Sequence, residues 1–540
     1  MVDAALSSFL VRLLIPLSGA LFLLRQPTSD DGHHLPSDPV WPRPTSVQYA
    51  DPEAYWRFQP ENLEIIFESD WNPVRDVLSK AEQRYKNNIP AIAAARPTSP
   101  AAPSNIAGQT SQIHVSIESS SIVMDLYTRE DYHIEITPGH GVQIRSSTVF
   151  GVLRALQTFS QLIQQVGHDH KRQFFIRCGT IDDGPAFPFR GLMIDTARHF
   201  LPISVIETIL DGMEMDKLNV LHWHVSDDQS FPFQSQTNVQ LVQAAFSPRM
   251  TYSPEDVRHI AQLALLRGIR IIPEFDTPGH SASFGVGYPE VLAHCPDVAP
   301  ANQYMINPVK PETRQLMTTL LQEAVDVFDV SDMIHLGGDE VDTDCLQGDE
   351  EIRDYMHHNG ITDAKELLAD YQIFLEDLTN TKLNITAIVW QEVFDSDLPM
   401  DPSTIVDIWY NKDGVAHVTR SGRRALLSSC WYLDHLATDW PEMYNCDPLD
   451  FDADEDAKQR VLGGHSCMWG EKVDQTNAIS RIWPRASAAA ERLWSQRELV
   501  NDSGLRSSLA DRLDLHRCRL NILVVIIELV VSVIVYPGPL

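Results

Sequence analysis

The sequence predicts an α/β protein, in which a (β/α)8 barrel of the TIM type is preceded by a small α+β domain. Three observations support this prediction. The chain has 540 residues, and one domain typically takes about 100–200, so two domains are expected. Strand-like and helical patterns alternate regularly only in the second part of the chain. Polar side chains gather where the predicted strands of that part end.

The first predicted domain covers residues 40–180 and has a mixed pattern. Residues 113–117 and 132–137 are short strand-like runs, and residues 96–105 are typical of a flexible surface loop. Residues 149–165 carry apolar side chains at three- and four-residue spacing, which predicts an amphipathic helix. Strands and helices without regular alternation indicate an α+β domain.

The second predicted domain covers residues 188–519 and alternates apolar strand-like runs with amphipathic helices. The eight runs are residues 191–195, 220–224, 269–275, 333–337, 385–390, 404–409, 425–430 and 461–468. An open doubly wound sheet has the same pattern and is the alternative. The barrel is favoured because nearly every run ends in a carboxylate, His, Trp or Tyr, and barrel enzymes hold their active sites at these ends.

Both ends of the chain carry apolar segments. Residues 13–24 form one apolar run, which is too short for a comfortable membrane span but typical of a signal-peptide core. We therefore expect residues 1–25 to be a signal peptide or an anchor. Residues 520–540 form an apolar C-terminal tail, which diverges from the family pattern given below. We expect membrane contact only if the mature protein retains one of these two apolar segments.

The charge and the cysteines restrict the partners and the compartment. A formal net charge of −32 argues against nucleic acid and against anionic membrane surfaces. Asn384 and Asn501 each begin an N-glycosylation sequon, which together with the signal-like segment predicts a lysosomal or secreted protein. The seven cysteines all lie from Cys178 onward, and an odd number leaves at least one thiol unpaired.

The fourth predicted barrel strand ends in the sequence His-Leu-Gly-Gly-Asp-Glu, at residues 335–340. Two glycines let the backbone turn, so Asp339 and Glu340 can point into one pocket. Two neighbouring acids do not both ionise easily, so their pKa values separate and one can act as a proton donor. A surface Asp-Glu pair is the plainer interpretation, but the preceding apolar strand and glycines disfavour it.

Aromatic residues mark the ends of four other predicted strands: Trp390, Trp409, Tyr432 and Trp469. A pyranose ring has apolar faces that stack on aromatic rings, whereas its hydroxyls need polar partners. Any one tryptophan is more often a core residue. The recurrence of aromatic residues at strand ends favours a sugar-binding site.

Two further patterns are not interpreted as sites. His222 and His224 lie on one strand face, but no clustered third ligand follows at metal-site spacing. Gly285 and Gly287 lack the rest of a dinucleotide-binding motif. We therefore expect no metal and no cofactor.

Eight segments of the sequence resemble the β-N-acetylhexosaminidases of glycoside hydrolase family 20, especially the animal lysosomal and chitin-degrading members. The segments are residues 190–202, 218–233, 271–280, 335–342, 390–395, 431–434, 467–471 and 483–494. The resemblance runs from Trp41 to about Arg519. It implies a small α+β domain before a (β/α)8 barrel, as the pattern itself predicts.

The resemblance also implies a role for each site residue. Glu340 would be the general acid and base, Asp339 would orient the acetamide group of the substrate, and Tyr432 would donate a hydrogen bond to it. Asp227 and His280 would orient Glu340. The residues implied to bind the sugar are Arg190, Trp390, Trp409, Asp434, Trp469 and Glu471.

Further expectations follow from the family. The acetamide oxygen of the substrate would be the nucleophile, with an oxazolinium intermediate and retention of configuration. Cys295 and Cys345 would form a disulfide, and the protein would be a homodimer. The family's C-terminal tail supplies a cysteine partner for the one equivalent to Cys518, and here the tail has no cysteine.

Two functions from different classes are compatible with the sequence. The first is an exo-acting hydrolase of terminal β-linked GlcNAc or GalNAc from glycans, glycoconjugates or chitooligosaccharides. The alternative is a non-catalytic sugar-binding protein on the same scaffold. The pair formed by Asp339 and Glu340 favours catalysis, because a lectin has no need of it.

Overall fold

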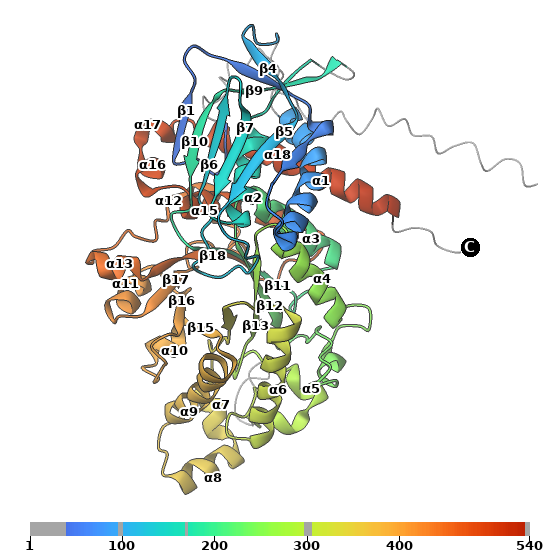
Figure 1. Cartoon of the computed structure of the whole chain (residues 1–540). Coiled ribbons are helices and arrows are strands. Elements are labelled where there is room, and N and C mark those ends of the chain that lie inside the picture. The colour runs from blue at the N-terminus through green and yellow to red at the C-terminus, as the bar shows by residue number, and fades with distance from the viewer. Residues whose placement is uncertain (1–38, 96–100, 168–170, 296–304, 535–540) are drawn as a thin grey trace, which may run out of the picture.

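A computed structural model describes residues 39–95, 101–167, 171–295 and 305–534, with the side chains at position 505 and beyond 523 left out (Figure 1). It confirms the predicted architecture, since an N-terminal α+β domain is followed by a closed parallel barrel of eight strands. The predicted signal peptide or anchor, residues 1–25, lies outside the described residues.

The N-terminal domain contains two sheets and two long helices. The first sheet has the order β1 (Ser46–Tyr49), β10 (Gly179–Asp183), β6 (Tyr132–Thr137), β7 (Gly141–Ser146), β5 (Gln112–Ile117), β3 (Glu64–Ile66). The second has the order β4 (Ile106–Thr110), β2 (Tyr55–Phe58), β9 (Gln173–Arg177), β8 (Gln164–Val166). The helices are α1 (Asn72–Ala94) and α2 (Val149–Leu162). Every residue of α2 is buried, so this helix is the centre of the domain core.

The barrel strands follow the eight predicted runs in order. They are β11 (Phe189–Asp195), β12 (Val220–Ser226), β13 (Arg270–Phe275), β14 (Met333–His335), β15 (Thr386–Trp390), β16 (Ile405–Ile408), β17 (Arg424–Leu427) and β18 (Val461–Met468). Strand β18 pairs with β11 and closes the barrel. The strands are buried on both faces, which explains why they read as continuous apolar runs.

Helices and short turns connect the strands. The longer ones are α3 (Ile203–Met215), α4 (Pro254–Leu265), α6 (Pro311–Val327), α8 (Glu350–Asn359), α9 (Ala364–Glu376), α11 (Asp413–Arg420), α15 (Arg485–Trp494) and α18 (Leu509–Ile534). The shorter ones are α5 (Phe284–Gly287), α7 (Thr343–Gly348), α10 (Gln391–Asp395), α12 (Trp440–Asn445), α13 (Glu455–Gln459), α14 (Ala478–Ile482), α16 (Arg497–Asn501) and α17 (Ser503–Arg506). Three short 3-10 turns, η2 (Pro60–Asn62), η4 (Leu241–Ala244) and η5 (Pro289–Val291), and a π-helical segment, η7 (Asp377–Leu383), are also present.

The barrel interior is filled in layers. An apolar layer lies at the amino-terminal ends of the strands and includes Phe189, Val220 and Ile272, closed from below by Leu126 of the N-terminal domain. An aromatic cluster of Trp390, Tyr432, Trp469 and their neighbours lies at the other end. Histidines and carboxylates occupy the space between these two layers. The polar groups of the interior therefore lie directly beneath the strand ends that carry the candidate site.

Helix α18 extends into the predicted tail, residues 520–540, and packs against α1 and α3 (Figure 1). Leu520 and Leu523 are buried in the barrel core. Among the described residues, no helix combines the length and the apolar character that a membrane span requires.

Two disulfides are present. One joins Cys295 to Cys345, the pair that the resemblance implied. The other joins Cys430 to Cys446 and was not predicted, because its two loops become neighbours only in the folded barrel. Cys518 has no disulfide partner in the part of the chain that the structure describes.

Candidate active site

The two catalytic carboxylate candidates lie on a turn that only glycine permits. Gly337 and Gly338 have φ values of 71° and 98°, and strand β14 ends before them, two residues earlier than predicted. A Cβ atom on Gly337 would lie 1.7 Å from Oδ1 of Asp276. The turn buries Asp339 and leaves the side chain of Glu340 60% exposed. One carboxylate thus faces the protein interior and the other faces solvent.

Three side chains from the loops that follow β12, β13 and β14 form a chain of contacts, which we call the relay. His280 Nδ1 lies 3.3 Å from Asp227 Oδ1, and His280 Nε2 lies 3.4 Å from Glu340 Oε2. The same Nε2 atom lies 3.9 Å from Asp339 Oδ2. The structure therefore brings together Asp227, His280, Asp339 and Glu340, as the resemblance implied.

The charges of the relay set the pKa values of its members. Burial opposes a charge on His280, but hydrogen bonds to Asp227 and Glu340 outweigh it and raise the pKa of the imidazole well above its usual value. The hydrogen bond from His280 lowers the pKa of Glu340. Without substrate, the proton of this pair therefore resides on His280, and Glu340 is ionised.

The pKa values of Asp339 and Glu340 separate as expected, since that of Asp339 is raised and that of Glu340 is lowered, and Asp276 is a third acid beside them. Burial, and then the charge of Asp339, raise the pKa of Asp276 well above its usual value, while burial raises that of Asp339. Asp276 Oδ1 accepts the Gly338 N–H at 2.8 Å. The pKa of Asp276 is raised further than that of Asp339, which favours a proton on Asp276 and a charge on Asp339.

Four aromatic side chains form what we call the aromatic wall: Trp390, Trp409, Tyr432 and Trp469. The rings of Trp390 and Trp469 lie 5.9 Å apart, and those of Trp409 and Tyr432 are stacked at 6.3 Å. Trp390 is fully buried, whereas Trp409 is partly exposed and donates its indole N–H to Glu392 at 2.7 Å. The wall thus has a buried back and an accessible edge.

Carboxylates and an arginine lie beside the aromatic wall. Asp434 is half-buried two residues after Tyr432, and burial raises its pKa. Glu471 is exposed after β18, and its charge acts on Arg198. Arg198 pairs with Asp195 at 3.1 Å and with Asp227 at 2.6 Å, and its guanidinium lies over the ring of Trp469 at 4.9 Å.

The predicted role of Arg190 is wrong. Arg190 is the second residue of β11, at the amino-terminal end of the barrel, and is fully buried. Its guanidinium pairs with Glu130 of the N-terminal domain at 2.7 Å and donates to Phe187 O at 2.9 Å. Sugar sites of barrels lie at the opposite ends of the strands. The arginine at that end is Arg198, eight residues later in the same matching segment.

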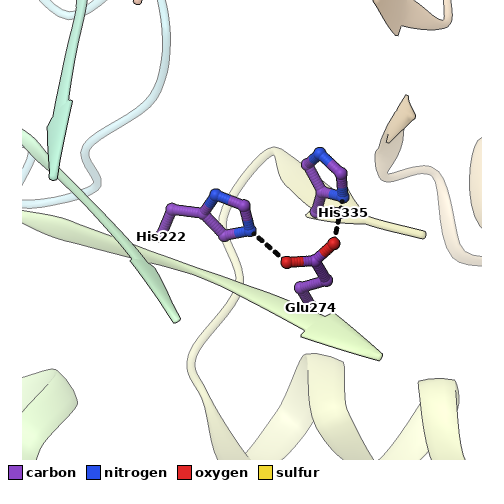
Figure 2. Close-up of side chains that lie close together, drawn as sticks. All are labelled: His222, Glu274 and His335. Atoms are coloured by element: carbon purple, nitrogen blue, oxygen red, sulfur yellow. Dashed lines mark ion pairs between the residues drawn. The ribbon is translucent and has the colours of Figure 1, made fainter. Parts of the chain in front are cut away.

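A buried polar cluster, the barrel network, lies beneath the aromatic wall; its members are His222, His224, Glu274, His335, Asp407 and His465. Figure 2 shows three of them, with His222 Nε2 2.9 Å and His335 Nδ1 3.0 Å from the Glu274 carboxylate. The sequence argument that His222 has no third ligand nearby is wrong in three dimensions, because Glu274 and His335 lie beside it. At these distances the groups contact one another directly, and the hydrogen bonds of Glu274 join it to His224 at 2.6 Å and to Trp390 at 2.8 Å.

Sequence reasoning missed four residues of the site, and two of them had a usable signal. Asp276 follows β13 directly, so the rule that strand ends carry function could have found it. Arg198 lies in the loop after β11, three residues beyond its last residue, Asp195. Glu274 lies inside an apolar strand and Glu392 inside a short helix, where no spacing distinguishes them from structural carboxylates.

A closed barrel with carboxylates, a histidine relay and an aromatic wall at its strand ends defines a glycosidase site. Residues 187–497 match the family model for the catalytic domain of glycosyl hydrolase family 20. Residues 40–162 match the model described as beta-acetyl hexosaminidase like.

Curated relatives agree with the family models. Beta-hexosaminidase subunit beta of Homo sapiens is 39% identical over 510 residues, which cover 90% of this chain and 87% of the relative. Beta-hexosaminidase subunit alpha of Bos taurus is 37% identical over 493 residues, 86% of this chain and 89% of the relative. The chain therefore belongs to glycosyl hydrolase family 20 and is an enzyme of the β-hexosaminidase type.

Solved structures share the fold. The exo-beta-N-acetylglucosaminidase of Vibrio harveyi, solved with N-acetylglucosamine, has a TM-score of 0.75 at 22% identity, covering 92% of this chain and 79% of that one. A mutant beta-hexosaminidase of Streptomyces plicatus in complex with GlcNAc has a TM-score of 0.69 at 20% identity, covering 90% and 95%.

Proposed function

We propose that the chain removes terminal β-linked GlcNAc or GalNAc from the non-reducing ends of glycans, glycoconjugates or chitooligosaccharides. The acetamide oxygen of the substrate attacks the anomeric carbon as the aglycone leaves, and water then opens the oxazolinium ion, so the configuration is retained. The observation that carries the proposal is the relay from Asp227 through His280 to Glu340, with Asp339 beside it.

Glu340 supplies the proton for the leaving group. His280 holds a proton 3.4 Å from Glu340, and movement of this proton to Glu340 generates the acid at the exposed end of the relay. When the aglycone has left, Glu340 is a carboxylate again and accepts a proton from the incoming water. His280 thus acts as a proton reservoir for a carboxyl group that is ionised at rest.

Asp339 and Tyr432 act on the acetamide group. The pKa of Asp276 is raised further than that of Asp339, which favours the charged form of Asp339, so Asp339 accepts the acetamide N–H and stabilises the positive oxazolinium ion. Burial raises the pKa of Tyr432 well above its usual value, which keeps its hydroxyl protonated as a donor to the acetamide oxygen. The aromatic wall encloses the acetamide and the pyranose ring.

Arg198, Asp434 and Glu471 bind the outer hydroxyls of the terminal sugar. The positions of these three residues support this role. Asp434 and Glu471 each lie two residues after a ring of the aromatic wall, Tyr432 and Trp469 respectively. The guanidinium of Arg198 lies over the ring of Trp469. A ring of charged groups around an aromatic face suits the alternation of hydroxyls and apolar faces on a sugar.

The test compares three 4-methylumbelliferyl β-glycosides, of GlcNAc, GalNAc and glucose. We expect hydrolysis of the first two and none of the glucoside, because glucose lacks the acetamide nucleophile. NMR of the first product should show the β-anomer. Binding of GlcNAc without release of 4-methylumbelliferone would instead support the sugar-binding alternative.

The compartment and the assembly belong to the same proposal. The two disulfides suit an oxidising secretory route, and we propose a lysosomal or secreted enzyme. Asn384 and Asn501 are exposed, as glycan acceptors must be, although Asn501 Oδ1 accepts a hydrogen bond from Arg492 at 2.9 Å. Light scattering on the purified protein tests the proposed homodimer, and peptide mapping tests the two glycans.

A further inference from the structure

His224 connects the relay to the barrel network. Its Nδ1 atom lies 2.6 Å from Glu274 Oε2, and its Nε2 atom lies 2.9 Å from Asp227 Oδ2. All three side chains are fully buried. A carboxylate only accepts hydrogen bonds, so His224 donates from both nitrogens and is an imidazolium ion.

Glu274 is the carboxylate that balances this charge. Besides His224, it faces His222 at 2.9 Å and His335 at 3.0 Å, and it accepts the indole N–H of Trp390 at 2.8 Å. Burial opposes its ionisation, but the charges of His335 and His224 outweigh it and lower its pKa well below the usual value. Glu274 therefore remains charged in the interior of the barrel.

We propose that Glu274 and His224 are positioning residues for the acid step, which extend the relay to Glu274, His224, Asp227, His280 and Glu340. The inference rests on the proposed role of Glu340 as the acid. In this chain the charges alternate from the barrel interior to the exposed carboxyl group, and each member contacts the next at 2.6 to 3.4 Å.

The physical reason is competition for the proton of His280. The negative charge of Asp227, which faces Nδ1, stabilises the imidazolium form of His280 and so holds the Nε2 proton that Glu340 needs. His224 and Arg198 both bind Asp227 Oδ2, at 2.9 and 2.6 Å, and weaken this stabilisation. Without Glu274, His224 loses its second proton and no longer offsets Asp227. His280 then holds its proton more tightly, and Glu340 receives it less often.

The experiment measures kcat/KM, which reports the first chemical step, on two substrates. Diacetylchitobiose has a poor leaving group that needs protonation, whereas 2,4-dinitrophenyl β-GlcNAc has a leaving group that departs without it. We expect Glu274→Gln to lower kcat/KM for the disaccharide by roughly tenfold or more, a part of the 10²–10⁴-fold that general acid catalysis contributes. The aryl glycoside should change by less than about threefold. Glu274→Asp, which keeps the charge, should recover part of the loss.

Two matched variants separate this role from others. Asp407→Asn removes another fully buried carboxylate of the barrel network, one that pairs with His465 at 2.6 Å and has no contact with Asp227. Trp390→Phe removes the indole N–H that donates to Glu274 from the aromatic wall. Both should affect the two substrates equally. Thermal melts establish that each variant is folded.

An equal loss on both substrates for Glu274→Gln, as for Trp390→Phe, would overturn the inference, because Glu274 would then act only through the aromatic wall. Glu340→Gln is the reference. If Glu340→Gln itself fails to discriminate the substrates, the proposed acid is wrong. If Glu340→Gln discriminates and Glu274→Gln does not, only the extension of the relay fails.

Discussion

His280 Nε2 lies 3.4 Å from Glu340 Oε2, and both residues have a left-handed backbone, with φ values of 51° and 50°. Such a backbone costs about 1–3 kcal/mol at a residue other than glycine and persists only where neighbours hold it. At these two positions it turns both side chains toward each other across two strand ends. The contact between the reservoir and the acid is therefore imposed by the backbone of both partners.

The first prediction concerns Glu340→Gln. The amide keeps the shape of the side chain but has no proton to give, so we expect kcat/KM on diacetylchitobiose to fall by roughly 10²–10⁴-fold. Steady-state kinetics on the purified variant check this, with a thermal melt to show an unchanged fold. Wild-type activity on the disaccharide would remove Glu340 from the mechanism.

The second prediction contrasts two arginines of one sequence segment. Arg190→Met breaks the buried pair with Glu130 and should lower the free energy of unfolding by about 3–5 kcal/mol, with little change in KM. Arg198→Met should raise KM and lower kcat, because Arg198 lies beside Trp469 and Asp227. Urea unfolding and kinetics on both variants decide between the two roles. If Arg190→Met raised KM and Arg198→Met left it unchanged, the structural role of Arg190 and the substrate-binding role of Arg198 would both be wrong.

The third prediction is a pH dependence of stability at Glu392. Burial raises the pKa of this carboxyl group to about 7, from a usual value of 4.5, and the charge of Asp339 adds to the shift. A raised pKa in the folded state favours the neutral form, so this stability is complete below pH 4.5 and is lost as the pH rises through 7. Solvent screening of a partly exposed group limits the loss to about 1–2 kcal/mol.

Glu392→Gln should therefore be more stable relative to the wild type at pH 8 than at pH 5, since glutamine has no charge to bury. Urea unfolding at both pH values measures the difference. A constant difference between the two proteins would show that Glu392 titrates normally.

The fourth prediction concerns the charge of the substrate. Asp434 is half-buried next to the expected position of the outer hydroxyls, and a sulfate there meets a like charge. We expect a marked preference for neutral GlcNAc glycosides over GlcNAc-6-sulfate glycosides. Burial raises the pKa of Asp434, so the preference should shrink as the pH falls and the carboxyl group is protonated.

The check is kcat/KM for the neutral and the 6-sulfated 4-methylumbelliferyl glycosides at two pH values. Asp434→Asn should improve the sulfated substrate selectively. His435 lies 3.9 Å from Asp434, and when it is protonated its positive charge offsets part of the repulsion. His435→Gln is therefore the matched control, and it should lower kcat/KM for the sulfated substrate selectively. Equal rates on both substrates for the wild type would show that Asp434 does not set this specificity.

The fifth prediction compares the two disulfides. The bridge from Cys295 to Cys345 closes 50 residues, and that from Cys430 to Cys446 closes 16. In the chain-entropy model these loops contribute about 4 and about 3 kcal/mol. We expect the double serine variant of the first pair to be the less stable, as measured by urea unfolding. A larger loss at the second pair would mean that local packing outweighs loop entropy.

The sequence predicted the barrel because parallel strands buried on both faces read as apolar runs, and because polar and aromatic residues at their ends favoured a barrel over an open sheet. It placed the end of β14 too late, since an apolar residue followed by glycine looks like strand until φ becomes positive. Arg190 was misplaced for a different reason. A matching segment shows that an arginine belongs to the family's pattern, but only the direction of the strand shows which end of the barrel it occupies.

Other features had no signal in the sequence. Glu274 reads as an isolated carboxylate inside an apolar strand, and its partners come from three other strands of the barrel. The raised pKa values of Asp276 and Asp339 depend on burial, which spacing does not reveal. Contacts between residues far apart in the chain are set by the closure of the barrel rather than by a local pattern.

Glu130 has a consequence for any attempt to recombine this enzyme with its relatives. This side chain of the N-terminal domain binds Arg190 and Asn219 of the barrel and Arg154 of α2, at 2.7 to 2.8 Å, all of them buried. A barrel produced without the N-terminal domain would expose Arg190 and leave it without the carboxylate of Glu130. A chimaera that takes the barrel from one protein and the N-terminal domain from another must therefore match both sides of this contact. A crossover between residues 183 and 189, the boundary of the two domains, would separate Glu130 from its partners.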